Sequence, residues 1–343
     1  MQVIQCMIMI LLGVLTMPTA EAGSADPLFQ SQDLLKVEIT APLNTLVRER
    51  SENEDLLGIF SYREADGTPV DLDIKVRARG NFRRRDCDFP PVTLNFRRSQ
   101  VEGTMFDQQN KLKMVAHCKI TRRYEQSVLR EYLAYRLLNS VTGLSFRVRL
   151  LQVTWVDSEE RRGRMVRIAF LIEHKNRLAA RIGREKQEIE RAEISSIEPD
   201  HMNLASMFQY LIGNFDFSPI AGSNSRCCHN YAMFGNGVDS LMAIPYDFDF
   251  SGLVKAPNAV PDSEMGVERV GQRVYHGYCV NNGYVKGSIS EFQKARDTLY
   301  ALVADQTELE PSVRHNVARY MDEFYEIIND PREVEQKIIG KCK

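Results

Sequence analysis

The sequence of 343 residues lacks the short motifs that mark several common enzyme classes. It has no G-x-x-x-x-G-K or G-x-G-x-x-G loop, which argues against P-loop and Rossmann-type nucleotide sites. It has no H-x-x-x-H or C-x-x-C pair, so neither a zinc cluster nor a thioredoxin-like redox site is expected. Ser218 has no G-x-S-x-G context, which disfavours a serine hydrolase.

The chain also has little net charge, formally −2 at neutral pH. No overall field would therefore draw it to nucleic acid or to an anionic membrane. Beyond residue 22, no apolar run is long enough to cross a bilayer. We expect neither a nucleic-acid partner nor a membrane span in the mature chain.

The first 22 residues have the layout of a secretion signal. An apolar run from Val3 to Met17 is followed by the small-residue stretch Thr19-Ala20-Glu21-Ala22, which matches an h-region and a cleavage site. The stretch before the run contains no Lys or Arg, which departs from the usual signal. We predict a signal peptide at 1–22 and export to the periplasm or the extracellular space.

The number of cysteines is consistent with export to an oxidising environment. Six remain after the predicted signal, and an even number in an exported chain favours disulfides over free thiols. Cys87 with Cys118 would close a local loop in the amino-terminal half, but the sequence does not choose among the other pairings. The six are Cys87, Cys118, Cys227, Cys228, Cys279 and Cys342.

Hydrophobic periodicity changes along the chain from strand-like to helical. Most apolar segments before residue 175 alternate with period two, whereas most later ones recur every three or four residues. The charged segment 184–200 is expected to form an exposed helix or insertion. This order predicts an α+β, two-lobed molecule with a sheet-rich N-lobe at 23–175 and a mainly helical C-lobe at 176–343. Strands are expected at 35–39, 72–78, 92–96, 111–115, 146–156 and 165–173, and helices at 125–139, 201–213, 290–304 and 311–329.

A turn signal in the second half predicts a hairpin. Gly235-Asn236-Gly237 separates two apolar runs, so 231–246 is expected to form two antiparallel strands with Asn230 opposite Pro245. Asp247 lies two residues beyond Pro245, which on a strand corresponds to roughly 6.6 Å on the same face. Asn230 and Asp247 are therefore expected to lie close together.

These residues have the chemistry of a divalent cation site. Asp249 shares the face of Asp247 by the period of two, and two carboxylates with an amide oxygen suit Mg²⁺ or Mn²⁺. Asp216, after the helix expected at 201–213, is placed to orient or deprotonate an attacking hydroxyl. Any one such acid is more often a surface or capping residue. The order of a loop Asp, an Asn before a hairpin and an Asp after it favours phosphoryl transfer.

A series of short motifs accompanies this order. They resemble motifs of the CotH-like kinases, a family named for a spore-coat protein and related to atypical protein kinases. The resemblance implies a two-lobed, protein-kinase-like fold that binds ATP with a divalent metal and phosphorylates proteins. It also implies that Asp216 is the catalytic-loop aspartate and that Asn230 and Asp247 are metal ligands. The motifs are Arg79-Gly80-Asn81, Asn95-Phe96, Val128-Leu129-Arg130, Phe170-Leu171-Ile172-Glu173, Asn214-Phe215-Asp216, Asn230-Tyr231 and Ile244-Pro245-Tyr246-Asp247-Phe248-Asp249, within about Val76 to Val254.

The sequence departs from this family in the segment 82–91, where members usually carry lysines that hold phosphates. Here the segment has no lysine. Lys111 and Lys113, or an arginine of the triplet 83–85, could replace them, although Arg and Lys are not interchangeable at a phosphate site. Glu125 or Glu131 could pair with that cation. The expected cofactor-binding residues are Lys113, Lys111, Arg79 and Glu173, the last at a strand end where backbone groups could meet adenine.

The leading hypothesis is thus an exported CotH-like protein kinase that uses ATP with Mg²⁺ or Mn²⁺ to phosphorylate a protein hydroxyl. One alternative is an inactive pseudokinase that serves as an envelope binding or structural module, which the missing lysine favours. A second is a metal-dependent phosphoester hydrolase that uses the same acidic cluster. The protein substrate is not evident from the sequence.

Overall fold

The computed structural model describes residues 26–221, 227–237 and 239–343. The predicted signal at 1–22 lies outside the described residues. Across these ranges, none of the helices combines the length and the apolar character that crossing a bilayer requires.

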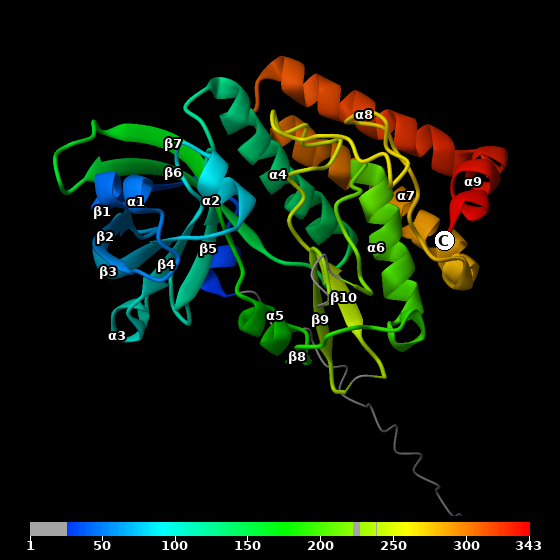
Figure 1. Ribbon diagram of the computed structural model, residues 1–343, viewed down its shortest axis with the longest axis horizontal. Helices are drawn as coiled ribbons and strands as arrows, with labels where there is room; N and C mark the ends of the chain where they lie inside the picture. The colour runs from blue at the N-terminus through cyan, green and yellow to red at the C-terminus, as the bar shows by residue number, and fades with distance from the viewer. Residues whose placement is uncertain (1–25, 222–226, 238) are drawn as a thin grey trace, which may run out of the picture.

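The first part of the described chain forms a closed barrel of seven strands (Figure 1). Its strand order is β1-β2-β3-β4-β5-β7-β6, and β1 pairs in parallel with β6, from Leu35 opposite Leu151 to Ala41 opposite Asp157. All other neighbours are antiparallel. The strands are β1 (Leu35–Ala41), β2 (Leu56–Arg63), β3 (Pro69–Ala78), β4 (Val92–Phe96), β5 (Lys111–Val115), β6 (Val148–Asp157) and β7 (Met165–Ile172).

The predicted two-lobed, protein-kinase-like fold with a sheet-rich N-lobe is wrong. Within the described residues, the strands close into a mixed barrel, which is accompanied by nine α-helices. The prediction failed because period-two patterns identify strands but not their partners, and the closing pair joins segments far apart in the sequence. The helices are α1 (Leu43–Glu49), α2 (Phe82–Asp86), α3 (Arg98–Val101), α4 (Arg122–Val141), α5 (Lys175–Arg181), α6 (Pro199–Ile212), α7 (Val285–Asp305), α8 (Pro311–Asn329) and α9 (Pro331–Lys337).

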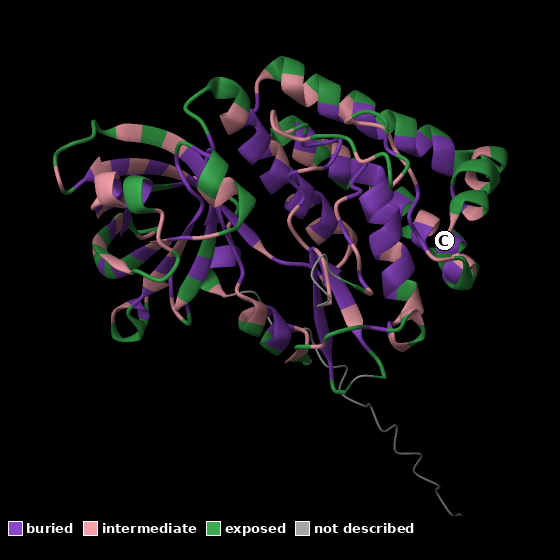
Figure 2. Cartoon of the chain, in the orientation of Figure 1, coloured by how far each residue is buried: buried purple, intermediate pink, exposed green. Residues whose placement is uncertain are grey.

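Strand β7 connects the barrel core with the helices. Its side chains alternate between the two faces of the sheet. Ala169 and Leu171 belong to the core inside the barrel, whereas Phe170 and Ile172 pack in the core that contains α4, α6 and the long carboxy-terminal helices. Helices α4 and α6 are largely buried, whereas α8 exposes its outer face (Figure 2). The two cores therefore share a common wall, which fixes the barrel relative to α4.

A small second sheet lies beside α6. It consists of β8 (Glu185–Gln187), β9 (Tyr231–Gly235) and β10 (Met242–Pro245) in the order β10-β9-β8. Segment 184–200, expected to be an exposed helix or insertion, supplies β8 and a 3₁₀ turn, and its last two residues begin α6. Short 3₁₀ helices complete the described elements: η1 (Pro27–Phe29), η2 (Ile194–Ser196), η3 (Cys279–Tyr284) and η4 (Ile339–Lys341).

The predicted hairpin forms, but its register differs by one residue. Pro245 pairs with Tyr231 rather than with Asn230, and the Tyr246 N–H donates to the Asn230 carbonyl over 3.0 Å. The turn between the strands is one residue longer than the glycine signal suggested. Helix α6, which precedes the hairpin, ends where the sequence predicted. Gly213 follows its last residue in the left-handed conformation with φ 60°.

Disulfides link three pairs of cysteines. Cys87 bonds to Cys118, as the short loop between them suggested. Cys227 bonds to Cys228, and Cys279 bonds to Cys342. The last of these ties the chain end to the 3₁₀ helix that precedes α7.

Acid should destabilise the protein through buried histidines, of which His117 is the clearest case. Its ring is 1% exposed, and both ring nitrogens lack a hydrogen-bond partner among the described residues. Burial, with Arg167 adding to it, lowers the pKa of His117 to about 4. Below the unfolded-state value near 6.5, the unfolded chain takes up a proton that the folded chain refuses. The free energy of unfolding should therefore fall as the pH drops from about 6.5 towards 4.

A His117→Phe variant tests this pH dependence, since phenylalanine can keep the stacking on Phe89 without titrating. Between pH 7 and pH 5, urea unfolding should show about 2 kcal/mol less acid destabilisation in the variant than in the wild type. His201 and His276, whose pKa values burial also lowers to about 4, remain in both proteins. An equal loss of stability in both proteins would show that His117 is not a source of the effect.

Candidate active site

The loop after α6 brings together three polar side chains. Asp216 and His229 form a hydrogen bond with 2.6 Å between Oδ1 and Nε2. Asn230 donates its amide Nδ2 to the Asp216 carbonyl at 2.7 Å and to Asp216 Oδ2 at 3.0 Å. The Asn214 amide oxygen accepts from the Asp216 N–H at 3.3 Å and steadies the loop. Both carboxylate oxygens of Asp216 are therefore engaged by donors.

His229 is the functional candidate that sequence reasoning missed. A lone histidine without a metal-binding spacing gave no signal, and its partner Asp216 lies 13 positions earlier. The hydrogen bond with Asp216 raises the pKa of His229, and burial only partly opposes this effect. The side chain is 38% exposed, so the ring can meet a substrate. The only indication in the sequence was that His229 precedes Asn230.

Asp247 and Asp249 lie just beyond β10 rather than on one strand face. The strand ends at Pro245, and Asp247 has a left-handed backbone with φ 64°. Phe248 between them is fully buried and packs on Tyr135 and Phe208, with ring centroids 4.6 and 5.4 Å apart. The Tyr135 hydroxyl also accepts from the Asp247 N–H at 2.8 Å. The buried phenylalanine thus holds the two acids at the edge of the core.

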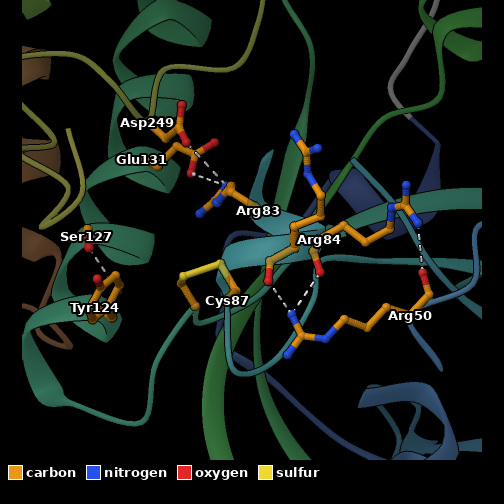
Figure 3. Close-up of a disulfide and its surroundings, with 10 residues drawn as sticks. Arg50, Arg83, Arg84, Cys87, Tyr124, Ser127, Glu131 and Asp249 are labelled. Carbon is orange, nitrogen blue, oxygen red and sulfur yellow. Dashed lines mark hydrogen bonds and ion pairs between the residues drawn. A yellow bond between two sulfur atoms is a disulfide. The ribbon is translucent and has the colours of Figure 1, made fainter. Parts of the chain in front are cut away.

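The acidic residues continue onto α4. Glu131 is 1% exposed and Asp249 is 6% exposed, and both face the guanidinium of Arg83 at 3.7 and 3.6 Å (Figure 3). Burial and the charge of Asp247 raise the pKa of Asp249 to about 7. Burial also raises the pKa of Glu131 well above its ordinary value, although Arg83 opposes this shift. The Arg83 side chain therefore lies between two buried carboxyl groups that resist ionisation.

Two of the predicted cofactor-binding cations lie near this cluster. Arg79 donates to the carbonyls of Val92 and Met114 at the ends of β4 and β5, and the charge of Asp247 acts on it. Lys113 lies 5.4 Å from the ring centre of Tyr246. The residue as a whole is exposed, but partial burial of its amine and the charges of Arg79 and Lys175 lower the pKa of Lys113 to about 8.

A pocket of about 210 Å³ adjoins Lys113. Whole small-molecule sites are usually about 300 Å³ or larger, so this pocket suits one ring system rather than a complete nucleotide. Aromatic, aliphatic and polar side chains all line it. The lining residues are Lys113, Tyr135, Phe146, Ile172, Glu173, His174, Lys175 and Tyr246.

Two of the predicted cofactor-binding residues are not available to a ligand in the expected way. The Glu173 carboxylate binds the Arg181 guanidinium at 3.0 and 2.9 Å, and the Glu173 N–H donates to the Arg147 carbonyl. Glu173 therefore supports the pocket wall instead of offering these groups to adenine. Lys111 is exposed on β5 and does not line the pocket.

The proposed metal site has few protein ligands, which is compatible with Mg²⁺. No group of three or more His, Cys, Asp or Glu side chains in the described ranges is arranged to hold a metal by itself. Asn230 and Asp247 lie at the two ends of one hairpin, where the Asn230 carbonyl also bonds the Tyr246 N–H. Mg²⁺ commonly uses only one or two carboxylates and takes its other ligands from water and substrate phosphates.

Comparisons with known proteins give no family. No protein-family model matches the chain, and no curated protein matches it either. The resemblance to the CotH-like kinases therefore remains a prediction that depends on the motifs alone. What the site can do follows from its geometry.

Proposed function

We propose that the protein transfers a phosphoryl group from ATP, bound with Mg²⁺ or Mn²⁺, to a hydroxyl of a protein substrate outside the cytoplasm. The observation that carries the proposal is that the His229–Asp216 pair and Asn230 lie at the end of the hairpin that leads into Asp247. Tyr246, which bonds the Asn230 carbonyl, lines a ring-sized pocket together with Lys113. Disulfides agree with an oxidising location, and the predicted signal at 1–22 gives the route of export.

The acidic cluster fits a divalent cation by its charge. Burial raises the pKa values of Asp249 and Glu131, and neighbouring carboxylates add to the shift, although Arg83 opposes it. A bound divalent cation would favour the ionised forms of these groups. Glu131 Oε1 is buried without a hydrogen-bond partner in the described structure. Asn230 Oδ1 and the carboxylates of Asp247 and Asp249 are the proposed ligands. A bound cation would neutralise charge on the phosphates of ATP.

The His229–Asp216 pair is suited to accept the proton of the attacking hydroxyl. Because both Asp216 oxygens already accept hydrogen bonds, Asp216 is better placed to orient His229 than to take a proton itself. In the tautomer that donates Nε2–H to Asp216, Nδ1 is the basic atom. This division of roles is that of a histidine base oriented by a buried or hydrogen-bonded acid.

The nucleotide would bind at the pocket next to β5 and β7 of the barrel. Lys113 and Arg79 provide positive charge towards Asp247, where phosphates would lie. Tyr246, Phe146 and Ile172 offer apolar walls for a planar base. Since the pKa of Lys113 is about 8, a bound phosphate would favour its charged form, and nucleotide binding at pH 8 should be accompanied by proton uptake.

A second candidate function is a nucleotide-binding module that performs no transfer. The specific observation in its favour is that Arg83 already neutralises Asp249 at 3.6 Å, which weakens Asp249 as a metal ligand. The same site could also hydrolyse a phosphoester, because His229 can accept a proton from water as well as from a hydroxyl. An assay that follows free phosphate and labelled protein together separates these functions.

Nucleotide binding should stabilise the folded protein, and replacing Asp247 should abolish that gain. With ATP and Mn²⁺ at about 100 times the dissociation constant, the wild type should gain about 2.7 kcal/mol of unfolding free energy. Asp247→Asn removes the charge while keeping a residue type that tolerates the left-handed backbone. The measurement is thermal unfolding of the oxidised protein with and without ATP and Mn²⁺.

The matched control is Asp297→Asn, which removes the same charge from a fully exposed site on α7. It should keep the full stabilisation by ATP and Mn²⁺. If the wild type gains no stability, the nucleotide site is refuted. Stabilisation in the wild type that persists in Asp247→Asn would place the nucleotide elsewhere in the protein.

A further inference from the structure

Helix α2 carries a charged side chain into the acidic cluster but has little to hold it in place. It comprises five residues, Phe82–Asp86, none of which is buried, and no side chain caps its first turn. An isolated helix of this length is unstable in water. Since apolar packing does not fix α2, its position depends on the bonds at its two sides (Figure 3).

On one side, a disulfide attaches the end of α2 to the segment that leads into α4. Cys87 follows α2 directly, and its N–H donates to the Arg83 carbonyl at 3.0 Å. Its sulfur is bonded to Cys118, and the Phe89 N–H donates to the Cys118 carbonyl at 3.2 Å. Both cysteines are buried. This disulfide thus joins α2 to the chain that enters the helix bearing Glu131.

On the other side, Arg50 forms hydrogen bonds with the backbone of α2. Its guanidinium donates to the carbonyls of Arg84 and Arg85 at 3.0 and 2.7 Å. Arg84 returns a bond to the Arg50 carbonyl at 3.0 Å and donates to the Gly80 carbonyl at 2.9 Å. These are hydrogen bonds to partly exposed groups, which contribute less than a covalent link.

We propose that Arg83 is a positioning residue for the acidic site and that the Cys87–Cys118 disulfide holds it there. Arg83 is the cation that both buried carboxyl groups, Glu131 and Asp249, contact. Its side chain is 19% exposed and crosses from α2 to α4 and to the loop after β10. The disulfide fixes the backbone from which that side chain extends.

Loss of the disulfide would release α2 and remove the shared cation from the two carboxyl groups. Uncompensated buried charge is costly, so the Asp249 side chain would then move towards water. This movement changes the arrangement of carboxylates beside Asp247. The effect on ATP rests on the proposed function, whereas the effect on Arg83 itself does not.

The test compares two double variants of the oxidised, full-length mature chain. Cys87→Ser/Cys118→Ser removes the disulfide beside α2, and Cys279→Ser/Cys342→Ser removes another one at the chain end. The first readout is the rate at which phenylglyoxal modifies Arg83, followed by peptide mass spectrometry. The second is the affinity for ATP with Mn²⁺, measured by calorimetry.

We expect Arg83 to react about tenfold faster in Cys87→Ser/Cys118→Ser, since local release exposes groups that the native fold protects. The control variant should retain the wild-type rate at Arg83. Affinity for ATP should fall about tenfold in the first variant and remain unchanged in the control, which corresponds to about 1.4 kcal/mol. Unchanged reactivity of Arg83 in the first variant overturns the proposal.

Substitution of Arg83 itself distinguishes positioning from general structural support. Arg83→Lys keeps a cation between Glu131 and Asp249 and should retain most of the affinity for ATP, whereas Arg83→Met should lose it. Equal affinity in the two variants overturns the positioning role. If the wild type binds no ATP, the proposed function fails, and the reactivity of Arg83 still decides whether the disulfide positions it.

Discussion

Replacement of His229 by glutamine should slow phosphoryl transfer by about a thousandfold, which is the usual size of a general-base contribution. Glutamine can still donate to Asp216 Oδ1, now 2.6 Å from the ring nitrogen, but it cannot accept a proton at neutral pH. Affinity for ATP should stay unchanged, because His229 does not line the ring-sized pocket. The measurement is transfer of labelled γ-phosphate to casein as a general acceptor, with released free phosphate followed in parallel.

The pH profile provides the control for this assignment. The hydrogen bond with Asp216 raises the pKa of His229, and a base works only when it is unprotonated. In Asp216→Asn this support is lost, so the pKa of His229 should fall and the acidic limb of the rate profile should move to lower pH. If His229→Gln is fully active while Asp216→Asn is inactive, Asp216 is itself the base.

Elements with a clear repeat could be predicted from the sequence. Helix α8 begins at Pro311 and ends at Asn329, as its apolar spacing and amino-terminal proline indicated. By contrast, β2 was not recognised because it breaks the alternation: Leu57 and Ile59 are exposed, and Gly58 lies where a side chain would meet the Thr40 carbonyl at 2.7 Å. Without β2 and the parallel β1–β6 pair, the closed barrel could not be foreseen.

In the site, too, contacts between residues near in the sequence could be predicted, whereas contacts between distant segments could not. The grouping of Asp216, Asn230 and Asp247 could be predicted because the chain places them at the ends of one helix and one hairpin. The contacts of Arg83 could not be predicted, since its partners Glu131 and Asp249 come from α4 and from a distant loop. Sequence spacing cannot rank such partners, because their distances are set by how the barrel packs on α4.

The Glu173–Arg181 pair should be one of the most sensitive points for stability. Arg181→Met is expected to lower the free energy of unfolding by about 3–5 kcal/mol, as for other buried pairs that lose one partner. Both side chains are nearly inaccessible, at 5% and 2% exposure. The variant leaves the Glu173 carboxylate buried without its cation, and the carbonyls of Gly143 and Ser145 lose their donors at 2.8 and 2.6 Å. Denaturant unfolding of the oxidised protein measures this change.

Two further variants separate charge burial from loss of packing. Glu173→Gln/Arg181→Met also removes the buried negative charge and should recover part of the lost stability, since the amide can still accept from the Arg147 N–H. Lys294→Met removes a cation from the exposed pair with Glu291 and should cost less than about 1 kcal/mol. If Arg181→Met costs no more than Lys294→Met, the pair does not anchor the connection between β7 and α5. A large loss that the double variant recovers would show that the buried charge of Glu173, which lines the pocket, depends on Arg181 for its stability.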